Sequence, residues 1–98
     1  MITSMIQRAE QLAKAAPYDV NTSFQHLVEE VGEVGTVLNV QTTGRKKLDE
    51  DIFGECADVI NCALEVFFKS GGTIDLLKER LIHKQNKWEA SQCRLTSQ

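Results

Sequence analysis

Apolar residues recur at intervals of three and four along almost the whole of this 98-residue chain. This spacing matches the 3.6-residue period of an α-helix, and no stretch shows the alternation or the β-branched runs that strands need. The sequence therefore predicts an all-α protein. Its four helices are expected at about 3–16, 22–39, 48–70 and 73–93.

Turn-forming and capping residues mark the expected ends of these helices. Pro17 stops the first helix, because proline lacks a backbone donor and clashes with the preceding turn. Thr22 and Gln25 fit the capping-box pattern and are expected to open the second helix. The glycines at 71–72 end the third helix, and Thr73 is the expected N-cap of the fourth.

The apolar side chains are expected to face one shared core. The third helix is apolar on nearly every side between 52 and 68, so it should be the most buried element. Short connections then favour an antiparallel four-helix bundle, formed by a single domain over residues 1–98. The side chains expected to point inward on the second and fourth helices are Phe24, Leu27, Val28, Val31, Leu38, Ile74, Leu77, Leu81 and Trp88.

The charge and hydropathy of the chain exclude several classes of partner. A net charge of −3 gives no general reason to bind nucleic acid or an anionic membrane. No apolar stretch is long enough for a signal peptide or a membrane span, so we expect a cytoplasmic protein. Cys56, Cys62 and Cys93 form no CxxC pair, which favours reduced thiols in the core over a disulfide or a zinc site.

Two acidic pairs stand out on the two central helices. Glu30 and Glu33 are three residues apart on the second helix, and Glu55 and Asp58 repeat this spacing on the third. Side chains at i and i+3 point the same way, so antiparallel neighbours would bring all four carboxylates together. At ~5 Å and an effective dielectric near 20, each like-charged pair costs about 3 kcal/mol. The all-oxygen ligand set predicts Mg²⁺ as the compensating cation, with Mn²⁺ able to substitute.

The same acids also fit other kinds of surface or site. A solvated acidic face is the usual fate of such a cluster, but apolar residues at 31, 34, 52, 56 and 59 bracket the acids and leave little room for one. A di-iron site needs Glu-x-x-His units, and neither His26 nor His83 follows a glutamate by three residues. The sequence also lacks HExxH, a P-loop and GxGxxG.

The order of these motifs resembles a known family. "EEVGE" at 29–33, "GECAD" at 54–58, "DVINCALEV" at 58–66 and "KQNKWE" at 84–89 resemble the MazG-like nucleotide pyrophosphohydrolases of the all-α NTP pyrophosphatase superfamily. The resemblance implies an antiparallel helical bundle that hydrolyses nucleoside triphosphates, often deoxynucleotides, to the monophosphate and pyrophosphate with Mg²⁺. It also implies that the metal ligands are Glu30, Glu33, Glu55 and Asp58.

Roles around the metal follow from that chemistry. The carboxylates of Glu30 and Glu33 are the candidate catalytic groups, and Glu29 is either a further base for the attacking water or a plain surface acid. Phosphate charge needs cations, and the candidates are Lys84, Lys87 and the loop cations at 45–47, all of which also suit a solvated surface. Asn61 is a candidate substrate ligand or a satisfied core amide.

We therefore expect a Mg²⁺-dependent pyrophosphohydrolase acting on nucleoside triphosphates, with a role in removing aberrant or surplus nucleotides. Since so short a unit cannot cover its own core, self-association as a homodimer or homotetramer is expected. Two alternatives stay open. One is a non-enzymatic bundle that binds partners and whose acids only hold a cation, and the other is an enzyme acting on a different phosphoanhydride.

Overall fold

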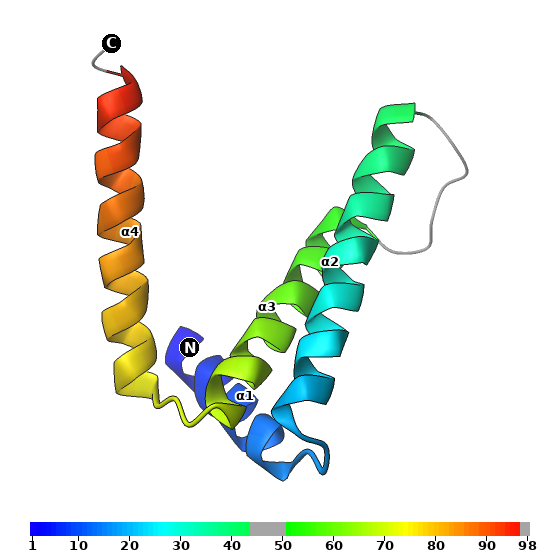
Figure 1. Ribbon diagram of the computed structural model, residues 1–98, viewed down its shortest axis with the longest axis vertical. Coiled ribbons are helices and arrows are strands. Elements are labelled where there is room, and N and C mark those ends of the chain that lie inside the picture. The colour runs from blue at the N-terminus through cyan, green and yellow to red at the C-terminus, as the bar shows by residue number, and fades with distance from the viewer. Residues whose placement is uncertain (44–50, 97–98) are drawn as a thin grey trace.

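The computed structural model describes the backbone of residues 1–43 and 51–96 and the side chains of residues 1–39 and 51–94. These residues form four α-helices: α1 (Ile2–Ala15), α2 (Val20–Thr43), α3 (Ile52–Lys69) and α4 (Ile74–Thr96) (Figure 1). They contain no strand, which confirms the prediction of an all-α protein with four helices. The predicted start of the third helix at 48 lies outside the described residues.

The start of α2 differs from the sequence prediction. The backbone N–H of Thr22 donates to Oδ1 of Asp19 at 3.0 Å, and the N–H of Ser23 donates to the Asp19 carbonyl at 3.2 Å. Asp19 is therefore the N-cap, and the predicted capping box of Thr22 and Gln25 is wrong. Both patterns are good caps, but Asp19 comes earlier and lets the helix gain most of a further turn. The bond from Thr22 also lowers the pKa of Asp19.

The other helix ends follow common capping chemistry. Oδ1 of Asp51 accepts from the N–H of Gly54 at 2.7 Å and caps α3. Oγ1 of Thr73 accepts from the N–H of Leu76 at 3.2 Å, which confirms Thr73 as the cap of α4. At the end of α3, Gly71 has a φ of 96° and donates its N–H to the Phe68 carbonyl at 3.0 Å. Because this backbone region suits only glycine, the predicted stop at 71–72 is confirmed.

The packed unit consists of α1, α2 and α3. The helices α2 and α3 run antiparallel, and α1 packs on α3 (Figure 1). One stripe of α2 faces α3, and its side chains recur at intervals of four and three. They are buried or half-buried: Ser23, Leu27, Glu30, Val34 and Val37. Among the side chains that the structure describes, the fully enclosed apolar ones are Ala13, Val37 and Phe68, so the core is small.

The connector between α1 and α2 is fastened to the end of α3. Nζ of Lys69 donates to the carbonyl of Ala16 at 2.9 Å and to the carbonyl of Tyr18. It also lies 4.7 Å from the centre of the Tyr18 ring. The hydroxyl of Tyr18 donates to Oε2 of Glu65 at 3.1 Å, and the ring packs edge-on against His26 at 5.2 Å between centroids. These contacts set the position of α1 and α2 relative to α3.

The last helix, α4, stands away from the other three (Figure 1). It packs along none of them within the described residues. Its side chains Leu81 and Trp88 are 49% and 66% exposed, so the prediction that they face a core is wrong for the single chain. The radius of gyration is 16.3 Å, whereas a compact domain of this length has about 13 Å. Three helices pack together, and the expected four-helix bundle is not completed within one chain.

Helix α2 also exposes apolar side chains, which matches this open shape. Four predicted core residues of α2 are about half exposed: Phe24, Val28, Val31 and Leu38. No helix in the described ranges is both long and apolar enough to cross a membrane.

Candidate metal centre

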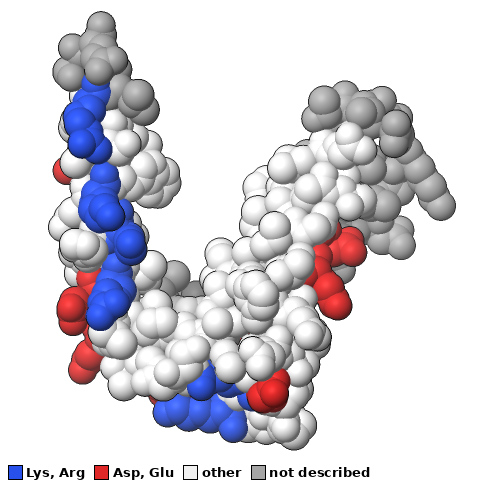
Figure 2. All heavy atoms as spheres, in the orientation of Figure 1, with Lys and Arg blue, Asp and Glu red and all other residues white. Residues whose placement is uncertain are grey.

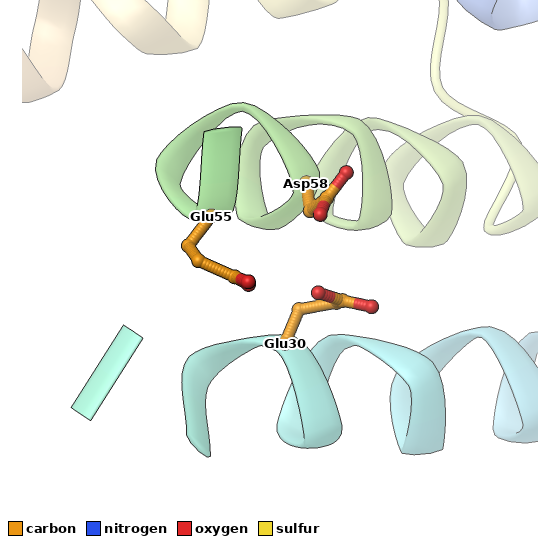
Figure 3. Close-up of side chains that lie close together, drawn as sticks. All are labelled: Glu30, Glu55 and Asp58. Carbon is orange, nitrogen blue, oxygen red and sulfur yellow. The ribbon is translucent and has the colours of Figure 1, made fainter. Parts of the chain in front are cut away.

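Three carboxylates from two helices meet between α2 and α3. Glu30 projects from α2 towards Glu55 and Asp58 on α3 (Figure 3). One oxygen of each side chain lies within 4.8 Å of an oxygen of each of the others. We call these three residues the carboxylate cluster. The antiparallel packing of α2 and α3, which the short connection between them predicted, produces this convergence.

Local structure explains how each acid reaches the cluster. Glu30 belongs to the α3-facing stripe of α2, between Leu27 and Val34. Glu55 lies in the first turn of α3, where its N–H donates to the carbonyl of the N-cap Asp51 at 3.1 Å. Asp58 follows one turn later on the same side of the helix.

The cluster is poorly solvated as well as acidic. Glu55 is only 4% exposed, and Glu30 and Asp58 are half-buried. Like charges at such distances repel by about 3 kcal/mol per pair at an effective dielectric near 20. A divalent cation removes that cost, and three carboxylates leave positions for water and phosphate oxygens. The residues present therefore fit Mg²⁺ or Mn²⁺, which prefer oxygen ligands.

The fourth predicted ligand lies apart from this cluster. Glu33 is an exposed residue of α2 and is not one of the three converging acids. It follows Glu30 by three residues but lies off the stripe that faces α3. Glu29 is exposed as well. The roles predicted for Glu33, as a ligand and as a catalytic carboxylate, stay predictions.

The predicted substrate-binding residues are spread over two regions. Asn61 is exposed on α3 and lines a groove of about 370 Å³ between α1 and α3, together with Arg8 and Glu65. Lys84 and Lys87 are exposed on α4, which does not pack against α2 or α3. One chain therefore does not bring the two lysines to the carboxylate cluster. The loop cations at 45–47 lie outside the described residues.

The cysteines are less buried than predicted. Cys56 and Cys93 are exposed, so the expectation of core thiols is wrong for these two. Cys62 is half-buried close to the cluster, and burial, followed by the charge of Glu30, raises the pKa of its thiol.

Sequence reasoning missed the anchoring role of two charged residues. Glu65 and Lys69 lie in the apolar second half of α3, where each holds a part of the connector. Their position could have indicated this role, because charged side chains in an otherwise apolar helix need partners when they are removed from water.

Comparison of the sequence with protein-family models, with curated proteins and with solved structures found no match.

Proposed function

We propose that this chain is a Mg²⁺-dependent nucleoside triphosphate pyrophosphohydrolase, which converts an NTP or dNTP and water to the monophosphate and pyrophosphate. The observation that carries the proposal is the convergence of Glu30, Glu55 and Asp58 between two helices. The motifs containing these acids resemble those of MazG-like enzymes, and that resemblance supports the choice of substrate. A part in clearing surplus or aberrant nucleotides is consistent with the reaction.

The residues divide into those that hold the cation and those that handle the proton. Glu30, Glu55 and Asp58 would hold Mg²⁺, which when bound neutralises triphosphate charge and lowers the pKa of a coordinated water. Glu33 is exposed and follows Glu30 by three residues, and we assign it the role of taking a proton from the attacking water. The water oxygen bonds to the α-phosphorus, and the bond from that phosphorus to the bridging oxygen breaks, releasing pyrophosphate.

The second candidate function is partner binding by a non-enzymatic helical protein whose acids only hold a cation. The observation that favours it is the exposure of apolar residues on α2 and α4, including Val31 and Trp88. Such surfaces mark interaction sites in soluble proteins. In this case the cluster would bind a cation without turnover of any phosphoanhydride.

An assay of pyrophosphate release separates these functions. The eight common NTPs and dNTPs are tested with Mg²⁺ on the native chain and on Glu55→Gln, Glu33→Gln and the control Glu79→Gln, an exposed acid of α4. We expect Glu55→Gln to lose at least about 100-fold, because even residues that only support metal ligands cost 10–100-fold. Glu79→Gln should retain native activity. Release from no substrate would refute the proposal, and equal turnover by Glu55→Gln would refute the ligand assignment.

The same panel should include a nucleotide sugar and a phosphoribosyl nucleotide. If one of these is cleaved faster than every triphosphate in a metal-dependent reaction, the carboxylate cluster would still be the active site, but its substrate would be a different phosphoanhydride. The proposed triphosphate specificity would then be wrong.

A further inference from the structure

The charges of the chain are unevenly distributed between α4 and the other helices. Of the 11 Lys and Arg residues and 14 Asp and Glu residues of the chain, α4 holds five and three. The net charge of −3 gives the whole chain no general reason to bind a polyanion, but it is the sum of a basic helix and an acidic remainder. Since salt screens charges more than about 10 Å apart, α4 can attract an anion that the chain as a whole cannot.

The cations of α4 gather on one side of the helix. At 100° per residue, four of them fall within about 80° of one another around the axis. We call them the basic row: Arg80, Lys84, Lys87 and Arg94. All four are exposed. The acids of the helix lie outside this arc: Asp75, Glu79 and Glu89. Figure 2 shows the cations along α4 and the acids at its outer edge.

The basic row is available to a partner. Arg80, Lys84 and Lys87 form no hydrogen bond or ion pair with any side chain that the structure describes. Helix α4 also packs along no other helix in the described part of the chain, so the row is open to solvent. Like charges in a row repel one another, and a partner that presents a matching row of anions offsets that repulsion.

The length of the row favours a polymer over a small anion. From Arg80 to Arg94 the row extends about 21 Å, because the helix rises 1.5 Å per residue. A single mononucleotide covers only a part of that length. The phosphates of a nucleic acid strand follow one another every few ångströms, so one strand laid along α4 offers a phosphate to each cation. Ser91 falls within the same arc and adds a hydroxyl donor.

An exposed aromatic ring borders the row. Trp88 follows Lys84 by four residues, so the two side chains are neighbours on the helix surface. Proteins that bind single strands combine cations along the backbone with aromatic rings on which unpaired bases stack. In a duplex the bases are already stacked on one another and only their edges are accessible in the grooves. The ring beside the row therefore favours a single strand.

The surroundings of the row argue against two other anionic partners. A helix in the major groove of a duplex lies between two phosphate backbones, whereas α4 presents one row. An anionic bilayer would bind the apolar and basic faces of the helix together. The edge of α4 that faces the α2–α3 pair is largely uncharged (Figure 2), so a flat bilayer cannot reach that edge and the row at once.

We propose that α4 binds single-stranded nucleic acid, with the basic row on the phosphate backbone and Trp88 stacked on a base. Binding of this kind follows charge and stacking and is independent of base sequence. It gives Lys84 and Lys87 a role that needs no contact with the carboxylate cluster. The inference does not rest on the proposed function, because its tests contain EDTA and no nucleoside triphosphate.

Fluorescence anisotropy of a labelled oligothymidylate of about 12 nucleotides measures the binding. The native chain should bind it with a Kd of about 100 µM or tighter in 50 mM salt, the range of non-specific binding. Four contacts to a single strand predict that the affinity falls about 50-fold between 50 and 200 mM salt. No rise in anisotropy up to about 200 µM of chain, or an affinity that salt leaves unchanged, would overturn the proposal.

Charge reversal locates the contact on α4. Lys87→Glu lies in the row, and its matched control Lys78→Glu changes the net charge equally on the same helix but lies outside the arc. We expect Lys87→Glu to weaken binding about eightfold or more in 50 mM salt, as the loss of one phosphate contact requires. The control should stay within about twofold of the native chain. Equal losses for the two variants would mean that net charge, and not the row, attracts the strand.

The fluorescence of Trp88 tests the contact in the native protein, so it does not depend on a variant folding. Trp88 is the chain's one tryptophan, and stacking on a base should quench it. Quenching should saturate at the same concentration as the anisotropy. A strand that binds without quenching would place the contact away from this part of α4 and contradict the proposal.

Two further partners test the class of ligand. A hairpin duplex of the same phosphate count should bind more weakly than the single strand, and vesicles of phosphatidylcholine with about 30% phosphatidylserine should retain less chain than they do of a polybasic peptide. Tighter binding to the duplex would show that the partner is double-stranded. Sedimentation of the chain with vesicles, in salt that releases it from the single strand, would show that α4 is a membrane-binding helix. Either result would refute the proposal.

Discussion

Tyr18 and Glu65 are 47 residues apart in sequence, and the hydroxyl of Tyr18 donates a 3.1 Å hydrogen bond to Oε2 of Glu65. This bond joins the α1–α2 connector to α3 about one turn before the end of that helix. Together with Lys69 it holds α2 against α3, and that packing places Glu30 opposite Glu55 and Asp58. The geometry of the carboxylate cluster thus depends on polar contacts outside it.

The first prediction concerns the alkaline stability of this contact. The hydrogen bond to Glu65 raises the pKa of Tyr18, since ionisation would remove the donor and place an anion beside a carboxylate. A raised folded-state pKa means that the stabilisation is fully present below the unfolded value near 10 and is lost as pH rises through the higher folded value. Tyr18 is the only tyrosine, so an ultraviolet titration reports it directly. Tyr18 should titrate at a higher pH in the folded protein than in the urea-unfolded protein, and Glu65→Gln should reduce the difference between the two midpoints. Equal midpoints for the folded and unfolded chains would count against the bond.

The second prediction is that Lys69 stabilises the fold more than an ordinary surface lysine. Lys69→Met keeps the apolar stem but removes the bonds to the carbonyls of Ala16 and Tyr18. We expect a loss of about 2 kcal/mol in the free energy of unfolding, measured by urea denaturation. Lys14→Met is the control, because Lys14 is exposed and its ion pair with Glu10, at 3.6 Å within the same helix, is worth roughly 0–1 kcal/mol. Equal losses for the two variants would show that the anchor contributes little.

The third prediction concerns the repulsion within the carboxylate cluster. Asp58→Asn removes one of three crowded charges, so without metal it should raise the free energy of unfolding by about 1 kcal/mol or more. With Mg²⁺ or Mn²⁺ the native chain should gain more stability than this variant, because the cation binds the folded cluster. Thermal unfolding in EDTA and in each metal measures both effects. Asp75→Asn, an exposed acid of α4, should show neither. A variant that is less stable in EDTA and gains as much from metal as the native chain would argue against a cation site.

The fourth prediction separates two kinds of glycine. Gly71 has a φ of 96°, so Gly71→Ala should cost about 1 kcal/mol or more from backbone strain, although nothing lies within 4 Å of the added methyl group. Gly32 lies within α2 and also has open space around it, so Gly32→Ala should stabilise the chain by up to about 1 kcal/mol. Urea denaturation of the two variants should give shifts of opposite sign. A stabilising Gly71→Ala would mean that the turn after α3 does not need a left-handed residue.

Much of the local structure could be read from the residues alone. The helical period, the stop at the glycines after α3, the Thr73 cap and the pairing of acids on neighbouring helices all depend on interactions within a few residues or on a single short connection. Such signals are present in the chain itself, because backbone geometry and side-chain spacing do not depend on distant partners. The start of α2 was predicted wrongly because two good capping patterns compete within one turn, and only the folded helix shows which one is used.

The tertiary structure decided which of the predicted residues meet. An apolar stripe indicates that a helix packs on a partner, but it does not indicate which partner. The sequence therefore predicted that α4 joins a four-helix bundle, which the single chain does not complete. The same limit applies to the site: spacing placed Glu30 and Glu33 on one side of a helix, but the angle at which α2 packs on α3 brings Glu30 inward and leaves Glu33 exposed. Helix type follows from contacts near in sequence, whereas the rotation and partner of each helix follow from contacts between distant residues, such as Tyr18 with Glu65.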